Sequence, residues 1–529
     1  MNYNNNSNNI KELTKSKLKN GYEMKNITFN INGSEKNYEL YIIPALKDDR
    51  ASFYEGFLYI DTCDEDEVKY FKEYVRREVT GYVVRILFLF YRDSKGREKL
   101  FIKDYRENRA ITKNLDKITP AFNKKILKLL TEACINDEVK LEEVINELFD
   151  RRDVIEEFYK LYNKCKRFMI NKIKGIDESK KEEFVDNFIM QMMTLWYLQE
   201  KNFFNKDNRY FIHKFKEVTK HENIDRSKSN NYYKFLLDLF EKLQDSTDKQ
   251  YYEDERVGKV VIIGPAVFLN GSYDSKHIYI PDECFYKEGL TEELIKREAD
   301  KIDGDIPLLN LFESRDWIEG DINEYVIGSL YEKLITGMEK KHRGAYYTPE
   351  IITQYICKNT IEPYLLDKIN SKFNCHYKDI YTAIQEANKC ILECLFEELK
   401  NIKILDPAVG SAHFLESAMD VLVKLYYEII KKAKKLGLRE GFEILSVDES
   451  SNIKKINLLD IINDEETFTL YVKFFIILAR NIYGIDIMPT AINIDKARLF
   501  LALAKHFDVN RNKLFISLPN VHFNLTIGN

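Results

Sequence analysis

The stretch Lys403–Leu415, with the sequence KILDPAVGSAHFL, decides the fold class of the chain. Ile404 and Leu405 are apolar and close a short predicted strand, and Asp406 stands where that strand ends. Small residues then allow the backbone to turn sharply and to approach a ligand closely. From Phe414 onward the apolar residues recur at helical spacing. A strand that passes through small residues into a helix predicts a nucleotide site in an open α/β sheet.

The same loop excludes two common phosphate-binding sites. It lacks the Gly-Lys-Ser/Thr ending of a P-loop, and it lacks the three-glycine fingerprint of dinucleotide-binding folds. The sequence therefore predicts a nucleotide-type site that is not a phosphate cradle.

Residues 406–415, DPAVGSAHFL, closely resemble the S-adenosylmethionine loop DPAxGSGxFL of amino-methyltransferases that modify adenine in DNA. Residues 344–349, GAYYTP, resemble a helix-cap element of that family, and residues 484–499 resemble its ribose element, GxDxxPxAxxxAxxRL. The order of the three elements is that of the subclass that places the cap element first. The resemblance is specific over residues 330–529. It extends loosely to residues 184–203, which are similar to a connector helix of fused type II, IIG-like restriction–modification enzymes.

The cap element predicts the start of a helix. Thr348 can cap that helix and Pro349 suits its first position, and we expect the helix to stop near Pro363. A capped N-terminus offers free backbone N–H groups to a carboxylate. The resemblance implies that Tyr347, Thr348 and Pro349 close over the methionine part of S-adenosylmethionine.

Asp486 ends a second predicted strand. A carboxylate there can accept hydrogen bonds from both ribose hydroxyls of a nucleoside, and Ile487 can press on the adenine ring. We expect Asp406 and Asp486 to end neighbouring parallel strands, with Tyr347 to Pro349 facing the same crevice. The resemblance implies a set of cofactor-binding residues, namely Tyr347, Thr348, Pro349, Asp406, Ala408, Gly410, Ala412, Phe414, Asp486 and Ile487.

Two departures from the resembled family concern the loop and the catalytic motif. Ala412 stands where the family has glycine, and its methyl group is tolerable if the backbone φ is negative and the ligand leaves room. The catalytic Asn/Asp-Pro-Pro-Tyr/Phe motif is absent, because no Asn-Pro-Pro or Asp-Pro-Pro occurs in the chain. In the family this motif follows the segment that Leu518–Asn529 resembles. We therefore expect a truncated domain without catalytic residues of its own, which a separate C-terminal or specificity polypeptide would complete.

Composition predicts a soluble globular protein of several domains. The chain has 529 residues, of which 44% are apolar and 32% charged, so it can bury real cores. The net charge of −5 neither supports nor excludes a DNA partner, because only the binding face must attract phosphates. The resemblance implies double-stranded DNA as the partner.

The eight cysteines include no Cys-x-x-Cys pair. Cys390 and Cys394 would share a helix face, but buried free thiols explain this spacing better than a metal site, so no metal is expected. No signal peptide opens the chain, and the longest apolar runs, residues 83–91 and 260–269, are too short to cross a bilayer. We therefore expect no membrane partner and a cytoplasmic location.

We predict an α/β protein in five segments. Residues 1–20 form an Asn- and Lys-rich disordered tail, and residues 21–115 form a mixed α/β domain. Residues 116–250 are a helical connector, and residues 251–340 are a mixed connector. Residues 341–529 form a Rossmann-like S-adenosylmethionine-dependent methyltransferase domain that is incomplete at its C-terminus.

The domain of residues 21–115 has two interpretations. Fused restriction enzymes often carry an acidic residue followed by Glu-x-Lys on a strand. Glu67-Val68-Lys69 has this spacing but lies in a helix-like run, and Glu98-Lys99 near Lys103 fits no better. A structural or DNA-contacting domain is the simpler interpretation.

Four functional classes remain open. The first is a site-specific DNA adenine N6-methyltransferase of a restriction–modification or phage-defence system, in which a flipped adenine attacks the sulfonium methyl group in line. The second adds an active N-terminal nuclease. The third is a non-catalytic remnant that binds only cofactor or DNA. The fourth methylates RNA or protein, although the YYTP element and the long N-terminal region favour DNA.

We predict that residues 1–529 alone do not methylate DNA. The exocyclic amine of adenine is a poor nucleophile because its lone pair is delocalised into the ring. The resembled family localises this amine with the motif that the chain lacks. Transfer of labelled methyl groups to duplex DNA of mixed sequence, with an in-frame extended protein as the positive control, checks the prediction. Robust labelling by the 529-residue chain would contradict it.

Overall fold

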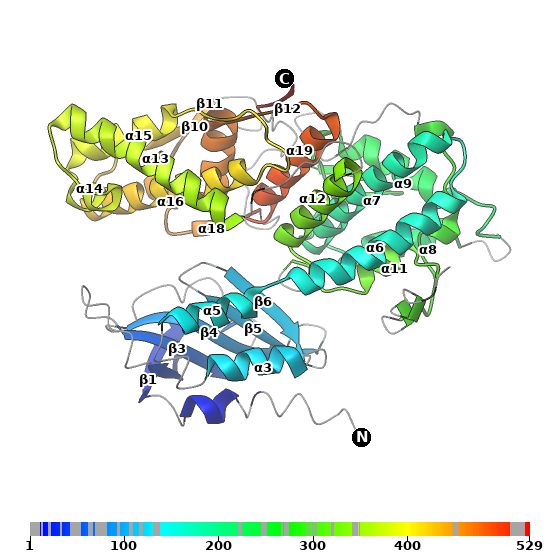
Figure 1. Cartoon of the computed structure of the whole chain (residues 1–529), viewed down its shortest axis with the longest axis horizontal. Helices are drawn as coiled ribbons and strands as arrows, with labels where there is room; N and C mark the ends of the chain where they lie inside the picture. Colours follow the sequence, from blue (N-terminus) through cyan, green and yellow to red (C-terminus); the bar gives the residue numbers. More distant parts are fainter. Residues whose placement is uncertain are drawn as a thin grey trace. The chain divides into compact units, whose positions relative to one another are not determined.

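The structure is a computed structural model in which two compact units are distinct (Figure 1). One unit contains Met1–Glu157 and Arg315–Asn323, and the other contains Phe158–Ser314 and Glu324–Asn529. The structure describes residues 11, 14–19, 23–31, 34–42, 54–61, 67–68, 82–92, 96–104, 109–115, 120–130, 138–220, 225–244, 251–265, 268, 275–291, 294–295, 297–298, 301, 304–318, 322–340, 348, 350–447, 453–507 and 524–528.

The first unit is built on a mixed six-stranded sheet (Figure 1). Its strands follow one another in the order β1-β2-β3-β4-β5-β6. The pair β3–β4 is parallel, and the other neighbouring pairs are antiparallel. The elements are β1 (Glu23–Ile31), β2 (Ser34–Ile42), β3 (Tyr54–Asp61), β4 (Tyr82–Arg92), β5 (Glu98–Asp104), β6 (Arg109–Asn114), α3 (Pro120–Leu129) and α5 (Glu138–Phe149).

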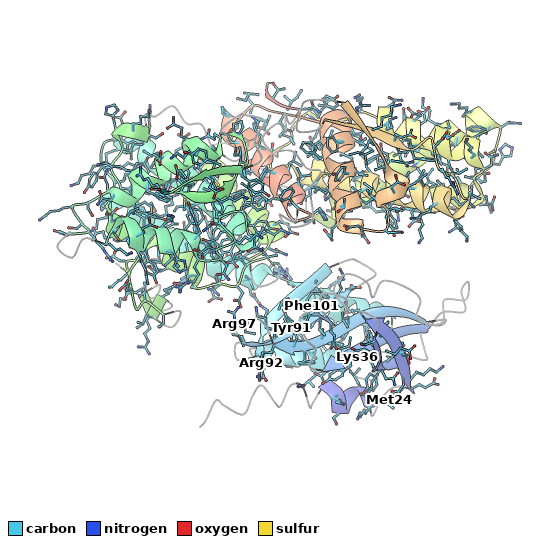
Figure 2. All side chains as sticks on the ribbon, turned by 180° about the vertical axis from the view of Figure 1, so that it is seen from behind. Met24, Lys36, Tyr91, Arg92, Arg97 and Phe101 are labelled. Atoms are coloured by element: carbon cyan, nitrogen blue, oxygen red, sulfur yellow. The ribbon has the colours of Figure 1, made fainter. Side chains whose placement is uncertain are left out.

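Strand β4 has a core on each of its faces. Phe88 and Phe90 pack into one core with residues of α3 and α5, while Leu87 and Leu89 pack into another on the opposite face. A strand buried on both faces is a nearly continuous apolar run, and ILFLF in β4 is such a run. Phe101, from β5, belongs to the second core, and Tyr91 packs against it (Figure 2).

Two predicted segment boundaries are wrong. Residues 14–19 are helical, and Leu18 is buried in the core shared with α3 and α5, so this part of the predicted disordered tail is ordered. The domain also continues beyond residue 115, because Ile126 of α3 and Leu141 of α5 are buried against the sheet. Both differences have one cause. These short helices are stabilised by packing their apolar residues on the sheet, which a local sequence pattern does not show.

A segment distant in sequence completes this unit. Asp316 accepts a hydrogen bond from Asn114 Nδ2 at 2.5 Å, and its other carboxylate oxygen lies 3.3 Å from the Arg97 guanidinium. Arg315 Nη2 lies 2.9 Å from Glu157 Oε1. These contacts tie Arg315–Asn323 to Arg97 just before β5, to β6, and to Glu157 in the first part of α6 (Arg152–Lys172).

We predict that Asp316→Ala loosens β5 and β6. Asn114 is only 3% exposed, so losing its acceptor should cost about 1–3 kcal/mol. Glu98→Ala is the matched control, because the Arg92–Glu98 pair is exposed and such pairs contribute about 0–1 kcal/mol. Hydrogen exchange of peptides covering β5 and β6 measures both effects. Equal acceleration in the two variants would show that Asp316 does not hold the segment.

The second unit begins with helices and continues into a parallel sheet. Its helical region contains α7 (Glu178–Glu200), α8 (Tyr210–Val218), α9 (Asn231–Leu243), α11 (Leu308–Glu313) and α12 (Glu324–Lys340), with the hairpin β7 (Tyr251–Asp254) and β8 (Gly258–Val261) and the 3₁₀ turns η4 (Ser275–His277) and η5 (Asp282–Cys284). Helix α7 is buried on all sides between Phe184 and Gln199, which explains its strong apolar run.

The rest of this unit surrounds a parallel sheet whose described strands have the order β13-β12-β9. Its elements are α13 (Glu350–Phe373), α14 (Ile380–Glu386), α15 (Lys389–Asn401), β9 (Ile404–Asp406), α16 (His413–Lys435), β10 (Glu443–Val447), β11 (Ile453–Asn457), α17 (Leu458–Ile461), α18 (Glu465–Val472), the π-helix η6 (Lys473–Asn481), β12 (Ile482–Asp486), α19 (Pro489–Ala504) and β13 (Leu525–Ile527). The whole chain is thus of mixed α/β class, as the sequence predicted.

Helix α13 does not stop near Pro363, so that expectation is wrong. It continues to Phe373 with the proline inside it. A stripe of buried residues spaced four apart runs along both halves of the helix, namely Cys357, Ile361, Leu365 and Ile369. Packing of this stripe outweighs the hydrogen bond that the proline cannot donate.

Candidate cofactor site

The predicted nucleotide loop lies between β9 and α16, as its sequence indicated. Strand β9 runs parallel to β12, with Asp406 opposite Gly484. Asp406 and Asp486 therefore end neighbouring parallel strands, which confirms this expected geometry. In open α/β sheets, ligands bind at this end of the strands.

The Asp486 carboxylate fastens the loop to the end of β12. One of its oxygens accepts a hydrogen bond from Gly410 N–H at 3.0 Å, and the other accepts one from Met488 N–H at 2.8 Å. Val409 N–H donates to the Ile485 carbonyl at 2.9 Å. The Asp406 carboxylate, in turn, accepts a hydrogen bond from Ala408 N–H at 3.1 Å. Four of the predicted residues, Asp406, Ala408, Gly410 and Asp486, are thus brought into one hydrogen-bonded group.

Gly484 makes this close approach possible. A Cβ atom at Gly484 would lie 2.6 Å from Leu525 Cδ2, 3.0 Å from Val409 Cγ2 and 3.2 Å from Leu415 Cδ1. Those contacts come from the neighbouring strand β13, from the loop and from α16. The glycine before Asp486 therefore lets the loop pack directly on β12.

Ala412 adopts the backbone conformation that the sequence argument required it to avoid. Its φ is +59° and its ψ is +16°, in the left-handed region, and the residue is fully buried. The condition of a negative φ therefore fails. The left-handed conformation costs a residue with a Cβ about 1–2 kcal/mol, so the loop stores strain at the position where the resembled family has glycine.

Several polar atoms around the loop are buried and lack a hydrogen-bond partner. They are Asp406 Oδ2, Ser411 Oγ and both carboxylate oxygens of Asp495. Asp495 lies on α19 and is fully buried. Unpaired buried polar atoms are costly and rare, so those of Asp406 and Ser411 after the end of β9 indicate a place for a polar ligand. These atoms fit a ligand that carries hydrogen-bond donors.

Burial raises the pKa of two of these carboxyl groups. Burial raises the pKa of Asp495 well above its usual range, and the negative charges of Asp486 and Asp406 act in the same direction while Arg498 opposes them. Burial also raises the pKa of Asp406, although the hydrogen bond from Ala408 lowers it and the charge of Asp486 raises it further. The three carboxyl groups therefore act on one another.

Arg498, on the same helix as Asp495, joins α19 to α16 and α12. Its Nε donates to Glu416 Oε2 at 2.7 Å, and its Nη2 donates to His413 Nδ1 at 3.0 Å. His413 Nε2 lies 2.7 Å from Glu332 Oε2 of α12. A Cβ atom at Gly328 would lie only 2.9 Å from the Arg498 guanidinium carbon, so this glycine makes room for the side chain.

The cap element is only partly described. Tyr347 and Pro349 lie outside the described residues, and Thr348 is half-buried. Helix α13 nevertheless begins beside the loop, because Thr353 Oγ1 lies 2.7 Å from Ser417 Oγ and Cys357 Sγ donates to the Phe414 carbonyl at 3.4 Å. The cofactor role predicted for Tyr347, Thr348 and Pro349 stays a prediction.

The other predicted residues lie around the loop at different depths. Ala408 is exposed, Phe414 is half-buried and Ile487 is 52% exposed. An exposed isoleucine directly after Asp486 leaves an apolar surface on which an adenine ring could rest. Asp495 and Ser411 were missed as site residues. The signal for Asp495 was present, since it is the acidic residue at the position where GxDxxPxAxxxAxxRL has its second alanine.

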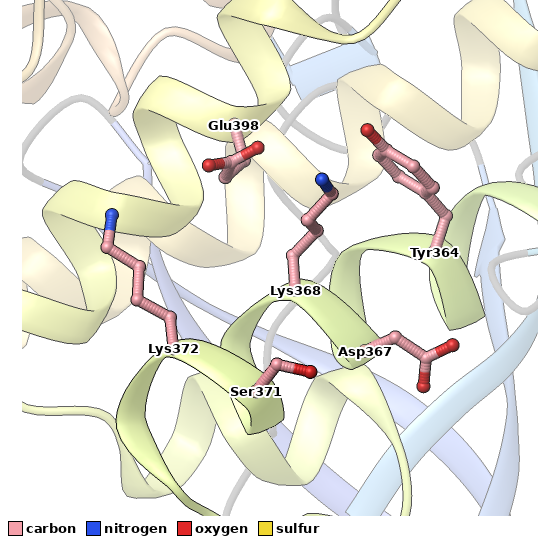
Figure 3. A pocket seen from close by; sticks show the side chains of 6 residues that line it. All are labelled: Tyr364, Asp367, Lys368, Ser371, Lys372 and Glu398. Atoms are coloured by element: carbon pink, nitrogen blue, oxygen red, sulfur yellow. The ribbon is translucent and has the colours of Figure 1, made fainter.

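A pocket on α13 and α15 is separate from this loop. Figure 3 shows the six residues that line it, Tyr364, Asp367, Lys368, Ser371, Lys372 and Glu398. None of the predicted cofactor residues is among them. Next to it, Lys372 Nζ donates to Cys394 Sγ at 3.0 Å, while Cys390 is exposed. Among the residues that the structure describes, no group of three or more His, Cys, Asp or Glu side chains could hold a metal ion.

The two nuclease candidates in the first unit do not form a common site in the described parts of the chain. Glu67 is buried and forms a salt bridge with Lys36, and Lys69 lies outside the described residues. Glu98 and Lys99 lie on β5, where Glu98 pairs with Arg92 across the strands at 3.2 Å. The interpretation as a structural or DNA-contacting domain therefore remains the simpler prediction.

The chain is similar to two proteins that are named for restriction or DNA methylation. It is 28% identical, over 454 residues, to a putative type II restriction enzyme and methyltransferase of Methanocaldococcus jannaschii, a match that covers 82% of this chain and 34% of the relative. It is 24% identical, over 290 residues, to DNA methyltransferase A of Bacillus subtilis, which covers 54% of this chain and 27% of the relative. The chain thus matches about a third of the length of these relatives. No family model matches.

Solved structures give a weaker likeness. The Type IIL restriction-modification enzyme MmeI in complex with DNA aligns with a TM-score of 0.40 and 15% identity, over 69% of this chain and 38% of that one. The DrdV–DNA complex aligns with a TM-score of 0.25 and 11% identity, over 94% of this chain and 35% of that one. At these scores the alignments establish no shared fold. Among the described helices, none is long and apolar enough to cross a bilayer.

We predict that Asp495→Asn stabilises α19 increasingly as the pH rises. The pKa of Asp495 is raised in the folded chain, so above about pH 4 the unfolded chain binds fewer protons and folding loses stability up to the folded pKa. Within that window the advantage of the asparagine variant should grow by about 1.4 kcal/mol per pH unit.

Hydrogen exchange of peptides from α19, compared between variant and parent protein at about pH 5 and about pH 7, measures this growth. Asp460→Asn is the control, since Asp460 is exposed on α17 and makes the same charge change. A difference that does not change with pH would show that Asp495 is ionised in the folded chain as readily as in the unfolded one.

Proposed function

We propose that this chain is the cofactor-binding part of a site-specific DNA adenine N6-methyltransferase of a restriction–modification system, and that S-adenosylmethionine binds at the loop between β9 and α16. The observation that carries the proposal is the loop itself. It is fastened to the end of the neighbouring strand by Asp486, and it leaves Asp406 Oδ2 and Ser411 Oγ buried without partners. The two named relatives support DNA methylation as the chemistry.

The residues present fit this cofactor by their chemistry. The Asp486 carboxylate has lone pairs beyond the two that bind Gly410 and Met488, and these would accept hydrogen bonds from ribose hydroxyls. Ile487 would contact the adenine ring. The buried oxygens of Asp406 and Ser411 would accept hydrogen bonds from the donors at the methionine end.

The protein's contribution at this site is positioning. S-adenosylmethionine supplies a methyl group on a positively charged sulfur. The chain fixes the loop before the ligand arrives, because backbone hydrogen bonds from Ala408, Val409 and Gly410 hold it to the two strand ends. Holding a reactant in one orientation lowers the entropic part of a reaction barrier. Double-stranded DNA is the proposed partner, by analogy with the named relatives, and the target adenine would be flipped out of the duplex.

We predict that Asp486→Ala weakens S-adenosylmethionine binding much more than Asp460→Ala. Asp486 would lose a charged acceptor for ribose, on the order of 1.5–3 kcal/mol or roughly tenfold to a hundredfold in Kd. The variant also loses the carboxylate that accepts the hydrogen bond of Gly410 N–H, and this loss should weaken binding further. Asp460 is exposed on α17 and makes the matched control. Calorimetric titration that gave equal affinities for the two variants would refute the assignment.

A further inference from the structure

We propose that Asp495 makes this site select a positively charged adenosyl cofactor over the neutral product that remains after methyl transfer. The inference rests on the proposed function, and it adds a specificity-determining residue to the same site. It starts from a fully buried carboxyl group on α19 whose two oxygens both lack a partner.

Asp495 lies on α19, the helix that follows Asp486 at the end of β12. The charges of Asp486 on β12 and of Asp406 on β9 both act on it, and Asp406 Oδ2 is likewise buried without a partner. Asp486 is already held by two backbone N–H groups. Of these three carboxyl groups, Asp406 and Asp495 are therefore the two that keep buried oxygens without a partner.

The cations nearby do not neutralise this group. Arg498 is the one cation that acts on Asp495 within the described part of the chain, and its Nε is held by Glu416 at 2.7 Å. Charged and titratable groups on the described elements near α19 include Asp406 of β9, Asp486 of β12, Arg498 and Lys505 near α19, His413 and Glu416 of α16, and Glu324 and Glu332 of α12. Lys505 lies 3.4 Å from Glu324, so it too is paired.

A positive ligand would change the protonation of this cluster. With no cation present, a buried carboxyl group without partners is most stable as the neutral acid. A sulfonium ion near the cluster favours the ionised form, so Asp495 releases its proton to solvent as the cation binds. S-Adenosylmethionine carries one more positive charge than S-adenosylhomocysteine, the product that has lost the methyl group. Ionisation of Asp495 therefore raises the affinity for S-adenosylmethionine only, and this advantage in affinity grows as the pH rises.

The sequence marks this residue as particular to the chain. In the pattern GxDxxPxAxxxAxxRL, the position of Asp495 is alanine, and an alanine has nothing to titrate. Asp495→Ala therefore installs the residue of the pattern, and Asp495→Asn keeps the size of the side chain while removing its charge. Both variants remove a costly buried acid, so folding is not at risk from the loss of this group.

The test is calorimetric titration of the 529-residue chain with S-adenosylmethionine and with S-adenosylhomocysteine between about pH 6 and about pH 8. In the parent protein the preference for S-adenosylmethionine should grow with pH, by at most about tenfold per pH unit for the release of one proton. Titrations in two buffers of different ionisation enthalpy should show proton release with S-adenosylmethionine only. In Asp495→Asn and Asp495→Ala the preference should stay constant within about twofold.

Three outcomes decide the matter. A preference that rises with pH in the parent protein and is flat in both variants supports the inference. A flat preference in the parent, or the same rise in the variants, overturns it while leaving the proposed function intact, because both ligands still bind. Failure of the parent protein to bind either ligand at any pH overturns the proposed function together with this inference.

Discussion

The hydrogen bond from Gly410 N–H to the Asp486 carboxylate is the contact on which the rest of the site depends. It joins two chain segments that are 76 residues apart in sequence, the turn after β9 and the end of β12. The parallel pairing of the two strands brings these ends together, and Gly484 allows the loop to pack on the sheet. Together with the hydrogen bond from Val409 N–H to the Ile485 carbonyl, this bond fixes the loop relative to Asp486.

Helix α19 connects this site to the helical region of the same unit. It follows Asp486, it bears the fully buried Asp495, and its Arg498 reaches Glu416 and His413. Glu332 of α12 contacts His413 in turn. Two consecutive turns of one helix therefore serve different purposes, since one bears an unpaired acid at the site and the next bears a buried cation that binds helices to each other. Burial disfavours the ionised form of Glu416. The positive charge of Arg498 and its hydrogen bond outweigh this effect, so the pKa of Glu416 is lowered.

Sequence reasoning succeeded where a local pattern is sufficient and failed where distant packing decides. Asp406 and Asp486 were predicted at the ends of strands because each follows a short apolar run and precedes residues that break a strand. The continuation of α13 through Pro363 was missed because it depends on burial of Ile361 and Leu365 on either side of the proline. Asp495 was missed because one acidic residue in a helix usually faces solvent, and only the three-dimensional structure shows that it does not.

The left-handed conformation of Ala412 at the start of α16 bears on the rate at which a ligand associates. Glycine at position 412 would reach this conformation without strain but would also sample many others, whereas alanine samples fewer. The structure holds Ala412 in one conformation through its burial and through the hydrogen bond of its N–H to the Val409 carbonyl at 2.9 Å. The ordering of the loop is therefore complete at the stage of folding. An incoming molecule meets a receptor that is already shaped, and its association need not wait for the backbone to rearrange.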